Sequence, residues 1–179
     1  MVANLLDEAF EVLRELNLLE LLNQHGRAEL VGSVALDLIV KPDIDLHLYT
    51  SDMDLLGKVN EIYGALLEHP KVSEVRISDY RPNGVKIGVD QYDGEFRFWD
   101  IDIWVSDRLE SIAFEITKTI QSKLTTQNRR TIIGIKQHYY KLGQLRNGMS
   151  HRIYQAVLDH NVSSLNEFER FLATTYRES

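Results

Sequence analysis

Residues 31–49 read VGSVALDLIVKPDIDLHLY and hold two motifs from which the rest of the chain can be interpreted. A Gly-Ser pair ends a short apolar run, and nine residues separate Ser33 from an Asp-x-Asp pair. The segment that begins with the Asp-x-Asp pair, residues 43–49, alternates strictly between polar and apolar residues. This period predicts a β-strand with Asp43, Asp45 and His47 on one face and apolar side chains on the other.

The Gly-Ser pair, Gly32 and Ser33, lies between an apolar strand at 28–31 and a short helix expected at 33–40. Glycine lets an anion approach the backbone without a Cβ in the way, and a helix start offers free N–H groups. The serine adds a hydroxyl. The turn therefore predicts a phosphate site, although the same pattern often serves only as a turn.

A second Asp-x-Asp pair, Asp100 and Asp102, lies in a strand expected at 96–105. If this strand neighbours the one that carries Asp43 and Asp45, four carboxylates converge on one face of a sheet. Carboxylate oxygens are ligands for Mg²⁺, and two such ions can stabilise the attacking and leaving oxygens of a phosphoryl displacement. A further carboxylate can accept a proton from an incoming hydroxyl. The alternative is an exposed edge strand with outward polar residues.

The remaining pattern predicts an α+β protein with a mixed β-sheet flanked by helices, followed by a C-terminal helical region. Asp93-Gly94 joins two strand-like runs and predicts a hairpin. We expect the α/β core to cover residues 1–106 and the helical region, packed on the core, to cover 107–179. The helices are expected at 4–23, 52–68, 109–123, 128–145, 151–160 and 164–176, and further strands at 72–77 and 85–91.

The composition is that of a globular protein with one domain or one domain and a helical appendage. The chain has 179 residues, of which 44% are hydrophobic and 26% charged, and it contains no cysteine, which excludes disulfides and Cys-based zinc sites. No apolar run approaches the roughly 18 residues of a membrane span. The N-terminal residues include early acids and lack a basic region, so we expect a cytoplasmic protein without a signal peptide.

Charge is distributed unevenly along the chain, whose net charge is −7. No acidic residue lies between Glu115 and Asp159, while that interval contains eight Lys or Arg residues; the rest carries 12 basic and 27 acidic residues, or −15. Within the interval, Lys136 could neutralise a triphosphate, and Tyr140 could stack on a base. Alternatively, the cations cover solvated helix faces and the aromatic rings pack inward.

The order Gly32-Ser33, nine residues, then Asp43-Ile44-Asp45 resembles the signature of the nucleotidyltransferase superfamily with the polymerase-beta-like fold, in its small bacterial type. The resemblance implies that Gly32 and Ser33 hold the β- and γ-phosphates and that Asp43 and Asp45 bind Mg²⁺.

The family's third carboxylate lies on a later strand between apolar neighbours, a description that fits both Asp100 and Asp102. The resemblance implies that this residue completes the metal site and acts as the general base. Asp100, which comes first after the aromatic run, is slightly preferred, but both stay candidates.

The activity implied by the resemblance is transfer of a nucleoside monophosphate from a nucleoside triphosphate, with two Mg²⁺ ions as cofactors. The expected acceptor is a hydroxyl of a small molecule, such as an antibiotic, or of a protein. No duplex nucleic acid and no membrane is expected as a partner. The alternatives are a non-catalytic nucleotide- or metal-binding module that acts as a partner or antitoxin-type subunit, and a generic α+β domain with exposed acids. The preferred nucleotide and the oligomeric state stay open.

Overall fold

The computed structural model describes residues 4–51, 54–146 and 148–175. The chain forms two compact units, which we call the sheet unit (Met1–Thr117) and the helical unit (Lys118–Ser179). The boundary therefore lies later in the chain than the division expected after residue 106. The reason is that Ile112 and Phe114 are buried against Val31 of the sheet unit.

The sheet unit contains a mixed five-stranded sheet, as expected for the α+β class. The central strands β2 and β5 pair in parallel, and every other pair of neighbours is antiparallel. The Asp93-Gly94 hairpin is confirmed, because the paired strands β4 and β5 flank this turn. In spatial order the strands are β1 (Arg27–Val31), β2 (Asp43–Tyr49), β5 (Phe98–Ser106), β4 (Val85–Asp93) and β3 (Val75–Asp79).

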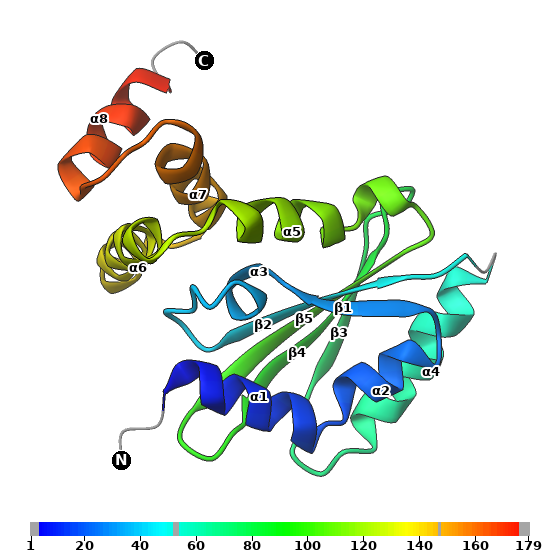
Figure 1. Cartoon of the computed structure of the whole chain (residues 1–179). Coiled ribbons are helices and arrows are strands. Elements are labelled where there is room, and N and C mark those ends of the chain that lie inside the picture. The colour runs from blue at the N-terminus through cyan, green and yellow to red at the C-terminus, as the bar shows by residue number, and fades with distance from the viewer. Residues whose placement is uncertain (1–3, 52–53, 147, 176–179) are drawn as a thin grey trace. The chain divides into compact units, whose positions relative to one another are not determined.

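Three helices cover one face of this sheet: α1 (Leu5–Glu15), α2 (Leu18–Asn23) and α4 (Leu55–Leu67) (Figure 1). The apolar face of β2 packs beneath them, and its residues Ile44 and Leu46 are fully buried. Burial of these side chains forces the alternating polar residues of β2 onto the opposite face. The hydrophobic core therefore decides which way the carboxylates point.

Three expected helices are wrong in their extent. The helix expected at 4–23 is divided into α1 and α2, because Asn17 adopts a left-handed conformation with φ 49°. The helix expected at 33–40 is the single turn α3 (Gly32–Ala35), after which Asp37 has φ 52°. A left-handed residue interrupts the helical hydrogen-bond ladder.

The third is the helix expected at 109–123, which is a 3₁₀ turn, η1 (Leu109–Ser111), followed by α5 (Phe114–Lys123). The strand expected at 72–77 begins at Val75. Two expected helices extend beyond the described residues, at 52–53 and at 176.

The helical unit is built from α6 (Thr126–Lys141), α7 (Met149–Asp159) and α8 (Leu165–Thr175), together with most of α5. Its interior contains an edge-to-face pair between Tyr139 and Phe168, with ring centroids 5.5 Å apart. Gly143, with φ 66°, follows α6 and ends it earlier than the expected residue 145. The acid-free stretch of the sequence therefore folds around aromatic and aliphatic side chains.

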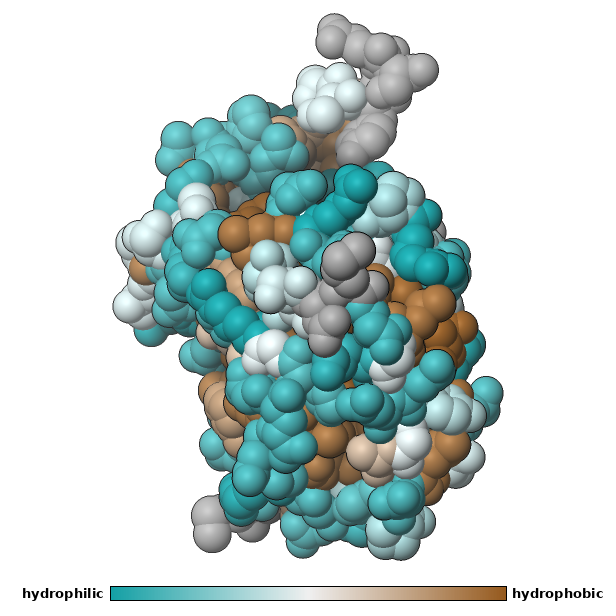
Figure 2. Space-filling view, turned by 90° about the vertical axis from the view of Figure 1, so that its right-hand side faces the viewer, coloured by the Kyte–Doolittle hydropathy of each residue, from teal (hydrophilic) through white to brown (hydrophobic). Residues whose placement is uncertain are grey.

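Polar side chains cover most of the surface in Figure 2, and apolar side chains appear among them in separate patches. No helix in the described part of the chain is long and apolar enough to cross a membrane.

Candidate active site

The parallel pairing of β2 and β5 brings the two Asp-x-Asp pairs together. In this register Asp43 lies beside Asp100, and Asp45 lies beside Asp102. Residues paired across neighbouring strands point to the same face of a sheet. The four carboxylates therefore share the face opposite α1, α2 and α4, as expected if the two strands were neighbours.

Gly32 lies directly against the second of these carboxylates. Its φ is +65°, and a Cβ added at this position would lie 2.8 Å from Asp45 Oδ2. Glycine avoids both the backbone strain and the collision. Ser33 is buried beside it at the start of α3, which has only four residues and therefore a small helix dipole. The turn expected to hold phosphate is thus adjacent to the carboxylate face.

The acidity of Asp45 is strongly perturbed. Burial, followed by the neighbouring carboxylates of Asp43 and Asp102, raises the pKa of the Asp45 carboxyl to about 7. The ammonium groups of Lys41 and Lys86 oppose the rise. A desolvated carboxyl next to like charges is a frequent property of functional sites.

Two lysines that the sequence patterns did not single out contact these carboxylates. Lys41 Nζ lies 2.5 Å from Asp43 Oδ2, and Lys86 Nζ lies 2.6 Å from Asp102 Oδ2. Lys41 is only two residues from Asp43, so its position in the sequence was a usable signal. Lys86 could not have been found in that way, because its contact depends on how β4 pairs with β5.

The pKa of the Lys41 ammonium is raised. Burial is the largest single influence and lowers this pKa, but the attraction of the Asp43 carboxylate and weaker attractions of Asp45 and Asp100 outweigh burial. Asp100 accepts a hydrogen bond from the Gln91 N–H at 3.2 Å.

The donor set fits a hard divalent cation. Asp43 Oδ1 is buried and accepts no hydrogen bond from the part of the chain that the structure describes, and an unsatisfied buried carboxylate oxygen is costly unless a cation accompanies it. Within residues 4–51, 54–146 and 148–175, no three His, Asp or Glu side chains already converge as a metal cluster. Asp43 and Asp102 instead contact lysines.

His47 shares the carboxylate face but is engaged elsewhere. Its Nδ1 accepts a hydrogen bond from the Ala113 N–H at 3.0 Å, and its ring lies 6.5 Å from that of Trp104. Burial lowers the pKa of His47 to about 4, so the imidazole is neutral at physiological pH. These contacts indicate a structural role, which anchors the segment after β5.

Lys136 and Tyr140, the expected nucleotide-binding residues of the helical unit, differ in their surroundings. Lys136 is 1% exposed, and its Nζ donates a hydrogen bond to the Tyr154 hydroxyl at 3.1 Å. Tyr140 is 45% exposed. Of the two, only Tyr140 presents a large part of its surface to solvent.

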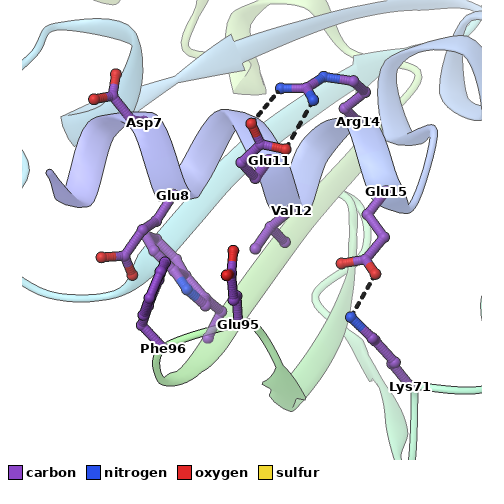
Figure 3. Close-up of a pocket in the computed structure, with 10 residues that line it drawn as sticks. Asp7, Glu8, Glu11, Val12, Arg14, Glu15, Lys71, Glu95 and Phe96 are labelled. Atoms are coloured by element: carbon purple, nitrogen blue, oxygen red, sulfur yellow. Dashed lines mark hydrogen bonds and ion pairs between the residues drawn. The ribbon is translucent and has the colours of Figure 1, made fainter. Parts of the chain in front are cut away.

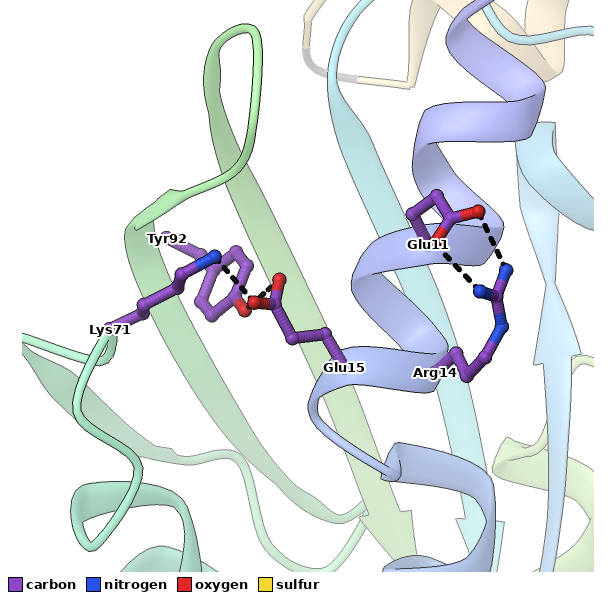
Figure 4. Close-up of polar contacts among 5 residues, drawn as sticks. All are labelled: Glu11, Arg14, Glu15, Lys71 and Tyr92. Carbon is purple, nitrogen blue, oxygen red and sulfur yellow. Dashed lines mark hydrogen bonds and ion pairs between the residues drawn. The ribbon is translucent and has the colours of Figure 1, made fainter.

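A pocket of about 660 Å³ lies between α1 and the loop that joins β4 to β5 (Figure 3). Val12 and Trp99, which line the pocket, belong to the helix-covered face of the sheet, so it is separate from the four aspartates. Although it contains several acids, Glu11 is paired with Arg14 and Glu15 with Lys71 (Figure 4).

Comparison with known proteins finds matches among solved structures alone; no family model and no curated protein sequence matches the chain. Cid1 poly(U) polymerase bound to MgATP aligns with 86% of this chain and 49% of its own, with a TM-score of 0.66 and 19% identity. Cid1 described for its RNA terminal uridylyl transferase activity gives a TM-score of 0.62, at 20% identity, over 86% of this chain and 46% of its own.

A cytoplasmic RNA terminal U-transferase aligns with a TM-score of 0.57 and 20% identity, over 86% of this chain and 46% of its own. The chain therefore spans about half the length of these solved structures. The neighbours belong to the polymerase-beta-like nucleotidyltransferase superfamily. Together with the mixed sheet and the position of its aspartates, this likeness shows that the chain has the polymerase-beta-like nucleotidyltransferase fold.

Proposed function

We propose that the protein is a Mg²⁺-dependent nucleotidyltransferase that transfers a nucleoside monophosphate from a nucleoside triphosphate to a hydroxyl, releasing pyrophosphate. One observation carries this proposal: the parallel register that aligns Asp45 with Asp102 on the face next to Gly32. The fold supports it, because the structural neighbours are named as nucleotide-transferring enzymes and include complexes with Mg²⁺ and nucleotides.

Asp43, Asp45 and Asp102 are the proposed metal ligands, and Asp100 lies at the border of the set. Two observations support this set. Oδ1 of Asp43 is buried without a hydrogen-bond partner among the described residues, and the charges of Asp43 and Asp102 are close enough to Asp45 to raise its pKa. Bound Mg²⁺ would neutralise phosphate charge and polarise the phosphorus centre, and two ions are proposed, as in other phosphoryl-transfer sites. The aspartates orient the reacting groups and supply negative charge at fixed positions.

For the general base we propose Asp102 in place of the slightly preferred Asp100. Asp102 lies beside Asp45 in the strand register and is among the groups that raise the pKa of Asp45, whereas Asp100 is not. In this proposal a carboxylate oxygen of Asp102 accepts the proton of the acceptor hydroxyl as its oxygen attacks the α-phosphorus.

Gly32 and Ser33 are the proposed seat of the β- and γ-phosphates. The support is the absence of a Cβ at Gly32, which leaves the backbone open beside Asp45. Lys136 and Tyr140 are proposed as further nucleotide-binding residues. The exposed ring of Tyr140 is available for stacking on a base, while Lys136 would have to give up its contact with Tyr154.

For the acceptor, we propose a hydroxyl of a small molecule or of a protein. Residues 1–117 contain 10 Lys or Arg and 23 Asp or Glu residues, a net charge of −13, which disfavours a polyanion on the carboxylate face. RNA is a second candidate, since the neighbours are named for terminal uridylyl transfer to RNA and poly(U) synthesis. The helical unit, at net +6, is the part of the chain with the charge to bind it.

The direct test is transfer of an α-labelled nucleotide in the presence of Mg²⁺. Small hydroxyl compounds, candidate proteins and single-stranded RNA serve as acceptors in parallel. We expect the wild type to release pyrophosphate and label one acceptor class, and the double variant D43A/D45A to lose this activity. Asp79→Asn is the matched control, because Asp79 pairs with Arg81 away from the four aspartates. Equal activity in wild type and D43A/D45A would exclude catalysis at this site.

The alternative is a non-catalytic module that binds nucleotide and acts as a partner or antitoxin-type subunit. Calorimetry separates this possibility from the enzyme. A module is favoured by tight nucleotide binding that is indifferent to Mg²⁺ and is accompanied by no pyrophosphate release. The presence of all the expected carboxylates weighs against it.

A further inference from the structure

Two lysines approach the candidate metal site from opposite sides. Lys41 precedes β2 and contacts Asp43, while Lys86 belongs to β4 and contacts Asp102. We propose that Lys41 and Lys86 are internal counter-ions of the metal site, each of which holds one metal-ligand carboxylate in the metal-free protein and is displaced when the divalent cation binds. This inference rests on the proposed metal site.

The contacts are short and specific. The two ammonium–carboxylate distances are 2.5 and 2.6 Å, so each lysine is in direct contact with its carboxylate. The side chains are partly shielded, since Asp43 is 20% exposed and Lys86, Lys41 and Asp102 are 32%, 37% and 42% exposed. Partial burial strengthens an ion pair relative to one at a fully solvated surface.

The lysines and the metal compete for the same two carboxylates. Lys86 holds Oδ2 of Asp102, and Lys41 holds Oδ2 of Asp43, whose Oδ1 has no hydrogen-bond partner among the described residues. An ammonium within 2.6 Å of a carboxylate oxygen occupies the volume in which a divalent cation would bind that oxygen. The strand register places the aspartates side by side, and the two lysines lie at the oxygens on either flank of the group. A cation that ligates either carboxylate neutralises the charge that attracts its lysine, so we expect metal binding to release both ammonium groups.

The arrangement also keeps charge balanced. Without the ammoniums, closely spaced carboxylates on one sheet face would repel one another. With them, the metal-free fold is stabilised at the cost of metal affinity. After displacement, both ammoniums stay tethered beside the site, where the phosphates that accompany the metal supply new negative charge.

The experiment compares Lys41→Met and Lys86→Met with wild type. Binding of Mn²⁺, a paramagnetic substitute for Mg²⁺, is followed by loss of the free-ion resonance signal, and metal-free thermal unfolding is recorded in a chelator. We expect each variant to bind Mn²⁺ about tenfold more tightly, equivalent to about 1.4 kcal/mol, and to unfold at a lower temperature without metal. Lys41→Gln and Lys86→Gln repeat the test with polar replacements.

Arg14→Met is the matched control. Arg14 lies on α1, which covers the opposite face of the sheet, and pairs with Glu11 at 2.7 Å, so its loss removes one positive charge without touching a proposed ligand. We expect its Mn²⁺ affinity to change by less than about threefold, because an exposed charge at longer range is screened. A purely structural lysine would lower the unfolding temperature but leave Mn²⁺ affinity unchanged.

The possible outcomes separate the two proposals. If the wild type binds Mn²⁺ and the lysine variants bind it equally or more weakly, the counter-ion role is wrong while the metal site stands. If neither the wild type nor D43A/D45A binds Mn²⁺, the metal site itself is wrong, and the counter-ion role is rejected with it. An equal gain in affinity in Arg14→Met would also reject the counter-ion role, in favour of general electrostatics.

Discussion

Asp45 combines three properties that rarely occur together in a structural carboxyl. It is desolvated, it lies next to two other carboxylates, and it touches the turn that contains Gly32. Burial and like charge keep it partly protonated near neutral pH. A divalent cation would favour its ionised form, so metal binding and deprotonation of Asp45 are expected to be coupled.

This coupling predicts a pH dependence of stability. The pKa of Asp45 is raised from 3.8 to about 7, so between these values the folded protein keeps a proton that the unfolded chain loses. The free energy of unfolding without metal should therefore fall as pH rises over this interval and level off above about pH 7. This pH dependence can be measured by thermal unfolding of wild type and Asp45→Asn between pH 4 and 8. If the difference in stability between the two proteins does not change with pH, the raised pKa of Asp45 is wrong.

Gly32 gives a second prediction at the residue scale. Gly32→Ala forces a left-handed alanine and brings its Cβ to 2.8 Å from Asp45 Oδ2, so we expect a loss of about 1–2 kcal/mol of stability. The rate of nucleotide transfer should also fall under conditions in which the Gly32→Ala variant is still fully folded, because the added Cβ lies at the proposed phosphate site. In the control Gly64→Ala, in the interior of α4, nothing lies within 4 Å of the new Cβ. That variant should gain about 0.5–1 kcal/mol, as measured by denaturant unfolding.

At the scale of elements, α1 is held to the sheet by polar contacts as well as by its apolar face. The Tyr92 hydroxyl on β4 donates to Glu15 on α1 at 2.7 Å, and Lys71 forms an ion pair with the same carboxylate (Figure 4). At the other end of α1, Arg97 donates two hydrogen bonds to the buried Glu8 carboxylate. These contacts orient α1 on the face that lacks the four aspartates.

The contact between Tyr92 and Glu15 can be tested separately from function. Tyr92→Phe removes the hydroxyl and should lower the free energy of unfolding by about 1 kcal/mol, while nucleotide transfer stays within twofold of wild type. Tyr80→Phe serves as a control, because that side chain is 53% exposed. A large loss of activity in Tyr92→Phe at unchanged stability would show that the two faces of the sheet are coupled.

At the scale of the whole molecule, the two compact units differ in charge. The sheet unit has a net charge of −13 and carries the candidate metal ligands, and the helical unit has a net charge of +6. An acidic unit favours cations, and a basic unit favours phosphate groups. The charge of the sheet unit by itself therefore suits the metal proposed for its aspartates.

Ligand binding should stabilise the whole molecule. At a free concentration 100 times the dissociation constant, a Mg²⁺–nucleotide complex should add about 2.7 kcal/mol to the free energy of unfolding. We expect at least one of the four triphosphates to raise the unfolding temperature only when Mg²⁺ is present. D43N/D45N should stay folded and lose this response. A flat screen over all four nucleotides would favour the generic α+β domain.

The sequence by itself determined the local arrangement of the central motif. Strict alternation from Asp43 to Tyr49 predicted β2 with its correct bounds, and Asp93-Gly94 predicted the hairpin before Asp100 and Asp102, because both signals depend on near neighbours in the chain. The helix ends were less predictable. Left-handed residues such as Asn17 interrupt helices that the apolar period alone would continue.

Only the tertiary structure decided which strands are neighbours and what surrounds the aspartates. The parallel pairing of β2 with β5 joins segments more than fifty residues apart, and burial under α1, α2 and α4 selects the face on which the carboxylates lie. The contacts of Lys86 and the raised pKa of Asp45 follow from that pairing. Distance and desolvation depend on the assembled sheet, whereas a sequence pattern records only spacing along the chain.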